Sequence, residues 1–367
     1  MKNLLHVTRP MLPPLEKLTP YLERIWQSGI LTNGGAVHEE LEAALVAHLG
    51  IRDISLFCNG TIALLTAVRA LGISGEVITT PFTFAATPHA LAWNGIKPIF
   101  TDIDPITFNL DPNRIEEAVT ESTTAILAVH VYGVPCDVEA IADIASRHNL
   151  KVIYDAAHAF GVHCHCGSVL NHGDASILSF HATKVFHTLE GGAVICNDPE
   201  DQSQVERLRN FGIINEVETS GIGLNGKLNE LQASIGLLNL ESIDEAITKR
   251  EAVAKFYEAK LSQLGFLKPA RKASALHDNF AYYPIVIEHG SRLNRDQITS
   301  ALLANDIRAR RYFYPLVSSF EPYRRYASPD DTPVAKDISE RVICLPIFPN
   351  MTDAEMNKVV KVLDTCQ

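Results

Sequence analysis

The segment KVIYDAAHAFGVHCHCGSVLNHGDASILSFHATK (151–184) determines both the fold and the chemistry that the sequence predicts. It contains two apolar runs, KVIYDAA (151–157) and ASILSFH (175–181), which are typical of buried strands. Asp155 lies near the carboxyl end of the first run, and Lys184 follows the second. Because ligands of parallel sheets bind at the carboxyl ends of the strands, we expect both side chains to line one site.

Similar apolar runs continue on both sides of this segment and alternate with helical patterns. The other predicted strands are VITT (77–80), PIFTDI (98–103), TTAILAVHVYG (123–133) and GAVICN (192–197). The predicted helices are VHEELEAALVAHLG (37–50), ended by its glycine, TIALLTAVRALG (61–72) and DVEAIADIASRHN (137–149). The alternation predicts an α/β fold with a mainly parallel sheet flanked by helices.

A second α/β pattern occupies the C-terminal third. It comprises long helices within 227–264, a strand at 281–288, a helix at 295–307 and a terminal helix at 352–367. A chain of 367 residues is too long for one minimal domain. We therefore expect a large domain at 1–240 and a smaller C-terminal α/β domain at 241–367.

Charge and composition exclude several classes of protein. The formal net charge is −11, which argues against a nucleic-acid partner because phosphate binding requires a surplus of Lys and Arg. No apolar run approaches the ~18 residues that a membrane helix requires. The seven cysteines are scattered and no leader precedes them, so we expect a cytoplasmic protein without a disulfide framework.

The lysine and the aspartate suit a pyridoxal 5′-phosphate site. An apolar strand precedes Lys184 and two glycines follow soon after, so burial is plausible, and a buried lysine readily becomes the neutral amine that forms Schiff bases. A buried Asp155 needs a cationic partner, which a protonated pyridine nitrogen supplies. A solvated surface lysine and a structural ion pair or helix cap are the alternatives.

Two further motifs supply the other parts of such a site. In CNGTIALL (58–65), the backbone around Asn59, Gly60 and Thr61 lies at a helix start and suits a phosphate dianion. In PFTFAAT (81–87), Phe82 and Phe84 follow a strand and can stack on a planar ring. An ordinary capped turn and core packing are the respective alternatives.

Together with SGILTNGG (28–35), DAAHAFG (155–161) and LNGKLNELQASIGL (224–237), these motifs resemble the sugar aminotransferases of the DegT/DnrJ/EryC1/StrS family, a fold-type I pyridoxal phosphate group. The resemblance implies that Lys184 forms the Schiff base and moves the substrate proton, and that Asp155 pairs with the pyridine nitrogen. It also implies a homodimer with shared active sites. The implied cofactor contacts are Phe84 on the ring, His158 by the ring hydroxyl, Gly60, Thr61, Ile62 and Ser179 on the phosphate, and Asn225 on the neighbouring subunit's cofactor phosphate.

The sequence departs from the family pattern at GLNGKL (223–228), where many members carry a tyrosine and an arginine around the asparagine. We assign the substrate carboxylate to Lys227. This motif and KVFHTLEGGA (184–193) are similar to the subgroup that makes dTDP-4-amino-4,6-dideoxyglucose. The resemblance thus implies amino transfer from L-glutamate to a nucleotide-linked keto-sugar, dTDP-4-keto-6-deoxy-D-glucose, in O-antigen or lipopolysaccharide biosynthesis.

Other functions fit less well. A 3-keto-sugar aminotransferase of the same family is the nearest alternative. GIGLNG (221–226) matches a dinucleotide fingerprint, but no apolar strand precedes it, which disfavours a nicotinamide-dependent oxidoreductase. The presence of both Lys184 and Asp155 disfavours a non-catalytic regulatory protein. HCHC (163–166) has zinc-type ligands, yet alternation along a strand lets at most two converge, so we expect a polar hairpin and no metal.

Overall fold

The computed structural model describes residues 4–270 and 275–367. The largest sheet in this part of the chain has seven strands. In spatial order the strands are β2 (Ser55–Phe57), β10 (Gly192–Cys196), β9 (Ala175–Ser179), β6 (Lys151–Asp155), β5 (Thr123–Val129), β3 (Glu76–Thr79) and β4 (Lys97–Phe100). Strand β10 runs antiparallel to both neighbours, and the other adjacent pairs are parallel. Six strands therefore end at the same edge, and the predicted mainly parallel sheet is confirmed.

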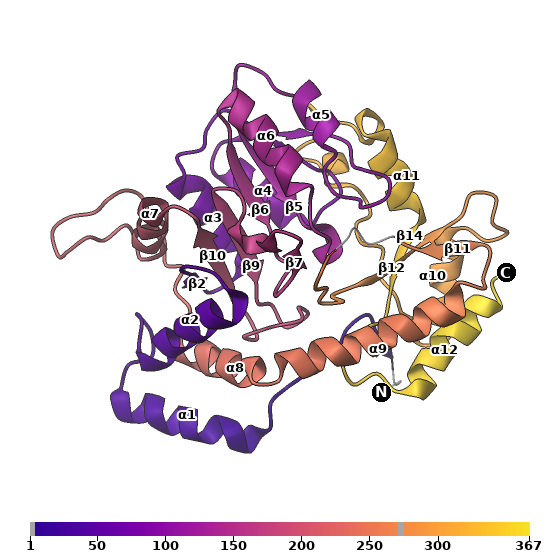
Figure 1. Ribbon diagram of the computed structural model, residues 1–367, viewed down its shortest axis with the longest axis horizontal. Coiled ribbons are helices and arrows are strands. Elements are labelled where there is room, and N and C mark those ends of the chain that lie inside the picture. The colour runs from indigo at the N-terminus through magenta and orange to yellow at the C-terminus, as the bar shows by residue number, and fades with distance from the viewer. Residues whose placement is uncertain (1–3, 271–274) are drawn as a thin grey trace.

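Both faces of the sheet are covered by helices, as Figure 1 shows. The helices of this part are α1 (Leu15–Ser28), α2 (Ala36–Leu49), α3 (Gly60–Ala70), α4 (Ala86–Trp93), α5 (Pro112–Glu117), α6 (Val138–His148), α7 (Pro199–Arg209) and α8 (Glu230–Leu240). Along β5, Ala125 and Leu127 join one hydrophobic cluster, whereas Ile126 and Ala128 join another. Because successive side chains point to opposite faces, a strand covered on both sides is apolar throughout.

Two predicted strands end three or more residues before their apolar runs do. Strand β4 stops at Phe100, and the buried carboxylate of Asp102 accepts hydrogen bonds from the amides of Val334 (2.9 Å) and Ala335 (2.8 Å). It therefore caps α11 (Pro333–Arg341) in the C-terminal part of the chain. Strand β5 ends at Val129, and the chain then turns through Tyr132 at a φ of 58°.

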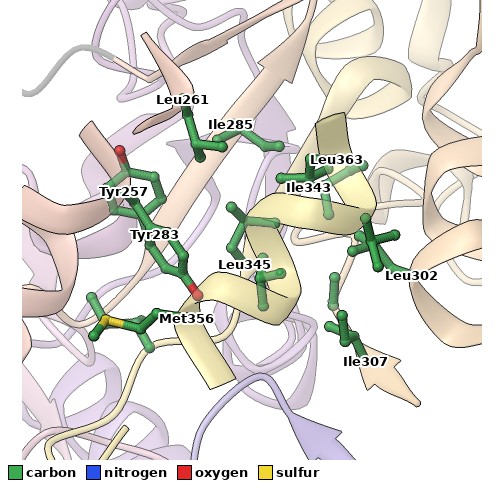
Figure 2. Packing of buried hydrophobic residues seen from close by; sticks show 14 of the residues in the cluster. Tyr257, Leu261, Tyr283, Ile285, Leu302, Ile307, Ile343, Leu345, Met356 and Leu363 are labelled. Atoms are coloured by element: carbon green, nitrogen blue, oxygen red, sulfur yellow. The ribbon is translucent and has the colours of Figure 1, made fainter. Parts of the chain in front are cut away.

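The C-terminal part has its own antiparallel sheet, in the order β11 (Leu267–Pro269), β12 (Tyr283–Ile287) and β14 (Val342–Leu345). Helices α9 (Ile243–Leu261), α10 (Arg295–Ala304) and α12 (Asp353–Asp364) accompany it, so the predicted strand and helices of this region are confirmed. Figure 2 shows their side chains packed in a common core. Leu5 joins this core because β1 (Leu5–His6) pairs with β13 (Ile307–Arg308). The boundary that we propose at 240/241 falls between α8 and α9.

Within the described ranges, no helix combines the length and the apolarity that crossing a bilayer requires. All seven cysteines are free thiols in the structure.

The core of the C-terminal part can be tested with two adjacent leucines of α10. Leu302 is fully buried at 0% exposure, whereas Leu303 is 51% exposed, and both changes to Ala alter helix propensity equally. We expect Leu302→Ala to lower the free energy of unfolding by about 2–5 kcal/mol, because it removes buried methyl groups and leaves a cavity. Leu303→Ala should change it by less than about 0.5 kcal/mol. Equal losses in denaturant titrations would contradict the assigned packing.

Candidate active site

Asp155 lies at the end of β6 and is 8% exposed. Its Oδ2 accepts a hydrogen bond of 2.7 Å from the hydroxyl of Thr87, and its Oδ1 accepts one of 3.1 Å from the amide of Ala157. The hydroxyl of Thr83 lies 2.8 Å from that of Thr87 and extends this chain. Burial raises the pKa of Asp155, while the two hydrogen bonds and the charge of Lys184 oppose the rise.

Both hydrogen-bond donors to this carboxylate are neutral groups. An ionised carboxylate that is removed from water is stable only with compensating hydrogen bonds and positive charge. The site therefore offers a preformed position for a cationic group of a ligand beside Asp155.

Lys184 lies five residues beyond the end of β9, after a tight turn in which its own amide donates to the carbonyl of His181 at 2.8 Å. Burial lowers the pKa of Lys184 to about 8, and the negative charge of Asp155 opposes this shift. A substantial fraction of the amine is thus neutral near physiological pH, as attack on a carbonyl requires.

His158 is buried in an aromatic setting close to the lysine. Its ring stacks on Phe313, with centroids 5.9 Å apart and an interplanar angle of 9°, and meets Tyr282 edge-on at 4.9 Å. Burial is the main cause that holds the pKa of His158 well below its usual value, and the charges of Lys184 and His130 lower it further. The imidazole is therefore neutral, and its buried Nδ1 lacks a hydrogen-bond partner within the described ranges.

The start of α3 lies against the end of β9. A Cβ atom added at Gly60 would lie 3.0 Å from the Cβ of Ser179, and one added at Gly192 would lie 2.6 Å from the amide nitrogen of Gly60. Position 192 requires a glycine for this approach, and a side chain at position 60 would press on Ser179, which lies beside the N-terminus of the helix. The first amides of a helix have no partner within it, so the Gly60–Ser179 region suits an anion.

One amide at this helix start is already bonded. Asn59 is the N-cap residue of α3, and its side-chain oxygen accepts a hydrogen bond of 2.9 Å from the amide of Ile62. The amides of Gly60 and Thr61 precede this capped position. The cap therefore stabilises the helix start and leaves the positive end of the helix dipole beside Ser179.

The two phenylalanines of PFTFAAT have different environments. Phe82 is fully buried and packs edge-on against Phe108, Tyr132 and Phe313, so the core interpretation is right for it. Phe84 is 62% exposed and offers a free aromatic face next to the end of β3. This ring is therefore available for stacking on a planar ligand.

Asn225 and Lys227 lie in the segment between α7 and α8, the projecting segment, of which one part extends outward beside α7 in Figure 1. Asn225 is exposed and forms a backbone bridge with Asn210. Lys227 donates from Nζ to the side-chain oxygen of Asn210 at 2.8 Å and lies over the ring of Phe211 at 5.1 Å. Lys227 also forms a backbone bridge with Phe57, and the amide of Cys58 donates to the carbonyl of Gly226 at 2.7 Å. The structure therefore gathers Asp155, Lys184 and His158, and it places these two residues at the inner end of the projecting segment, beside the chain that leads from β2 into α3.

Sequence analysis missed three residues of the site. Thr87 was inside a quoted motif, and its signal was a second threonine placed one helical turn after Thr83. Tyr282 and Phe313 pack on His158 from the C-terminal part of the chain, and no local pattern connects residues so far apart in the sequence.

Comparison with known proteins agrees with this geometry. The profile of the DegT/DnrJ/EryC1/StrS aminotransferase family matches residues 15–364. The chain is 50% identical to a dTDP-4-amino-4,6-dideoxy-D-glucose transaminase from Shigella dysenteriae over 99% of both chains. It superposes with a TM-score of 0.94 on DesI, solved in the presence of its TDP-sugar product, at 34% identity and covering 100% of this chain and 93% of DesI. NtdA from Bacillus subtilis, solved with bound cofactor PMP, gives 0.88 at 27% identity, covering 96% of this chain and 81% of NtdA.

The lowered pKa of Lys184 can be measured in protein freed of cofactor. Competitive labelling of lysines by an amine reagent, read by peptide mass spectrometry and normalised to the plateau at high pH, should give a midpoint of about 8 for Lys184. Lys17 is a control, because its ion pair with Glu241 raises its pKa above the ordinary value. Asp155→Asn should move the Lys184 midpoint to lower pH, since the carboxylate charge raises it. A Lys184 midpoint equal to that of Lys17 would contradict the assigned burial.

Proposed function

Because this chain belongs to the DegT/DnrJ/EryC1/StrS aminotransferase family, we propose that it transfers an amino group from L-glutamate to dTDP-4-keto-6-deoxy-D-glucose, giving dTDP-4-amino-4,6-dideoxy-D-glucose. The enzyme is an aminotransferase and its cofactor is pyridoxal 5′-phosphate. The observation that carries amino transfer is the pair of the buried Asp155 and the partly buried Lys184, which follow neighbouring parallel strands at one sheet edge. The choice of sugar is supported by the likeness to the Shigella transaminase.

The side chains around this pair fit the cofactor. Bound pyridoxal phosphate supplies an electron sink for charge that develops on the substrate carbon. Asp155 would hold the pyridine nitrogen in its cationic form, which gives the buried carboxylate its missing positive partner. The neutral His158, whose Nδ1 has no partner among the residues that the structure describes, would lie by the ring hydroxyl, and the exposed ring of Phe84 would stack on the cofactor.

The phosphate would bind where α3 meets β9. Gly60 and Thr61 supply backbone amides and the helix dipole, and Ser179 adds a hydroxyl beside them. The amide of Ile62 already donates to the side chain of Asn59. It would therefore contact the phosphate only by sharing its hydrogen between Asn59 and a phosphate oxygen. The tight packing of Gly60 against Ser179 and Gly192 would fix these donors before the cofactor arrives.

Lys184 would hold the cofactor covalently through Nζ and, once released, would carry the proton to and from the substrate carbon. A general acid–base group works best when its pKa lies near the operating pH, and burial brings the pKa of Lys184 to about 8. We assign Lys227 to the substrate carboxylate. Its amine donates to Asn210, and its backbone pairs with Phe57 at the end of β2, which leads into α3.

The projecting segment also supports a homodimer with shared active sites. Between α7 and α8 it exposes several apolar side chains, of which Val217 is 90% and Ile222 81% exposed, and Trp93 at the end of α4 is 81% exposed. Apolar surface of this kind is typical of a protein interface. Asn225 lies in the same segment, so contact between two copies would carry it toward the partner's cofactor phosphate. The seven free cysteines support a cytoplasmic location.

The substrate assignment predicts which product forms. With glutamate and a panel of dTDP-, UDP- and GDP-linked keto-deoxysugars, we expect amination of dTDP-4-keto-6-deoxyglucose, identified by mass spectrometry and NMR of the product. Lys184→Ala should lower the rate by at least about 100-fold, because it removes the acid–base group. Lys361→Ala, on the exposed side of α12, serves as the matched control. Exclusive turnover of a 3-keto isomer would refute the assignment.

The shared active site predicts complementation between two defective variants. We would mix Lys184→Ala with Asn225→Ala at limiting cofactor after reversible subunit dissociation. Each mixed dimer then contains one site with both native residues, so activity should rise to roughly a quarter of the wild-type value under random exchange. Mixing each variant with itself should give no gain. Absence of any gain, with mixed dimers verified by mass spectrometry, would exclude a contribution of Asn225 across the interface.

A further inference from the structure

The connection between β6 and β9 contains a cluster of two thiols and an imidazole that the reaction does not use. Strands β7 (His163–Cys164) and β8 (Gly167–Ser168) form a hairpin whose turn is His165–Cys166. The Sγ atoms of Cys164 and Cys166 are 2.7 Å apart. The Nε2 atom of His172 lies 3.6 Å from the first sulfur and 3.4 Å from the second.

These separations approach those of ligands around one zinc ion. Tetrahedral zinc with Zn–S bonds of ~2.3 Å and Zn–N bonds of ~2.0–2.1 Å places sulfur and nitrogen ~3.6 Å apart and two sulfurs ~3.8 Å apart. The two distances from His172 already match. The sulfurs must separate by ~1 Å, which a rotation of the exposed Cys166 side chain provides, since Cys166 lies in the turn.

We infer that Cys164, Cys166 and His172 form a zinc-binding site. Two thiolates and an imidazole select zinc over magnesium and calcium, which prefer oxygen ligands. The ligand atoms of Glu139, His165 and Cys166 also lie within 4.8 Å of one another, so the Glu139 carboxylate is within reach of a fourth position. Glu139, His165 and Cys166 are exposed, which gives an ion access from solvent.

The sequence prediction for HCHC was right in one respect: only two of its four side chains, both cysteines, converge with His172. The third ligand follows a short 3₁₀ turn, Val169–Asn171, outside the motif. Spacing within HCHC therefore does not show the site, because the chain must fold back before His172 meets the thiols.

The position of the cluster gives the ion a structural role. The hairpin joins the strand that ends at Asp155 to the strand that leads to Lys184. The amide of His163 in the same hairpin donates to the carbonyl of His277 at 3.1 Å, which connects it to the C-terminal part. A zinc ion would fix this connection without contact with the reacting atoms.

The first test is a zinc titration of the reduced holoenzyme after removal of metal with a chelator, using a chromophoric competitor. We expect one equivalent of tightly bound Zn²⁺. Removing a group that only orients a metal ligand lowers metal affinity about 10–100-fold. Cys166→Ser and His172→Ala remove ligands themselves, so each should lower the zinc affinity by more than about 100-fold. Cys366→Ser and His289→Ala, elsewhere in the structure, should bind zinc as the wild type does. Equal binding by all variants would overturn the site.

A second test uses the unmodified chain and does not depend on the folding of a variant. Zn²⁺ should protect Cys166 from alkylation by iodoacetamide in the native holoenzyme, as read by peptide mass spectrometry. Co²⁺ in place of zinc should give the visible bands of tetrahedral cobalt at wavelengths beyond the absorption of the cofactor. Unchanged alkylation at saturating zinc, or octahedral cobalt spectra, would refute the inference.

Discussion

The structure depends on the removal of two opposite charges from water at one sheet edge without a direct ion pair between them. The end of β6 buries the carboxylate of Asp155, and the segment after β9 partly buries Lys184, whose amine is desolvated enough to lower its pKa to about 8. These strands are neighbours in the sheet, so each group shifts the pKa of the other while neutral donors bind the carboxylate. Removing an unpaired charge from water costs free energy. A ligand with a positive charge would lower this cost for Asp155, and an aldehyde on the same ligand would react with the neutral amine of Lys184.

The rest of the site is arranged around this edge by ordinary packing. Glycines at 60 and 192 allow the N-terminus of α3 to approach Ser179, so the phosphate donors form part of the same layer as the lysine. Helix α4 begins next to β3 and supplies Thr87 to Asp155. The proposed zinc hairpin lies in the chain between β6 and β9, where it would limit movement of the two strands that carry the catalytic groups.

Much of this could be predicted because strands buried on both faces carry continuous apolar runs, such as Ala125–Val129 in β5 and Val152–Tyr154 in β6. Strand ends then located Asp155, Lys184 and the helix start at Gly60. Strand lengths were less predictable, since Asp102 ends β4 early to cap a helix from the C-terminal part. The enclosure of His158 by Tyr282 and Phe313 was not predictable either, because those contacts form only after the two parts of the chain meet. Helix α1 contains Pro20 and was not recognised, since proline normally interrupts a helical pattern.

The central claim is that the Nζ atom of Lys184 holds the cofactor. Borohydride reduction of the holoenzyme as isolated, followed by proteolysis and peptide mass spectrometry, tests it directly. We predict a phosphopyridoxyl group on the peptide that contains Lys184, and none there in the Lys184→Ala variant. A label on Lys227, the partly buried lysine of the projecting segment, or on any other lysine with Lys184 unmodified would contradict the account.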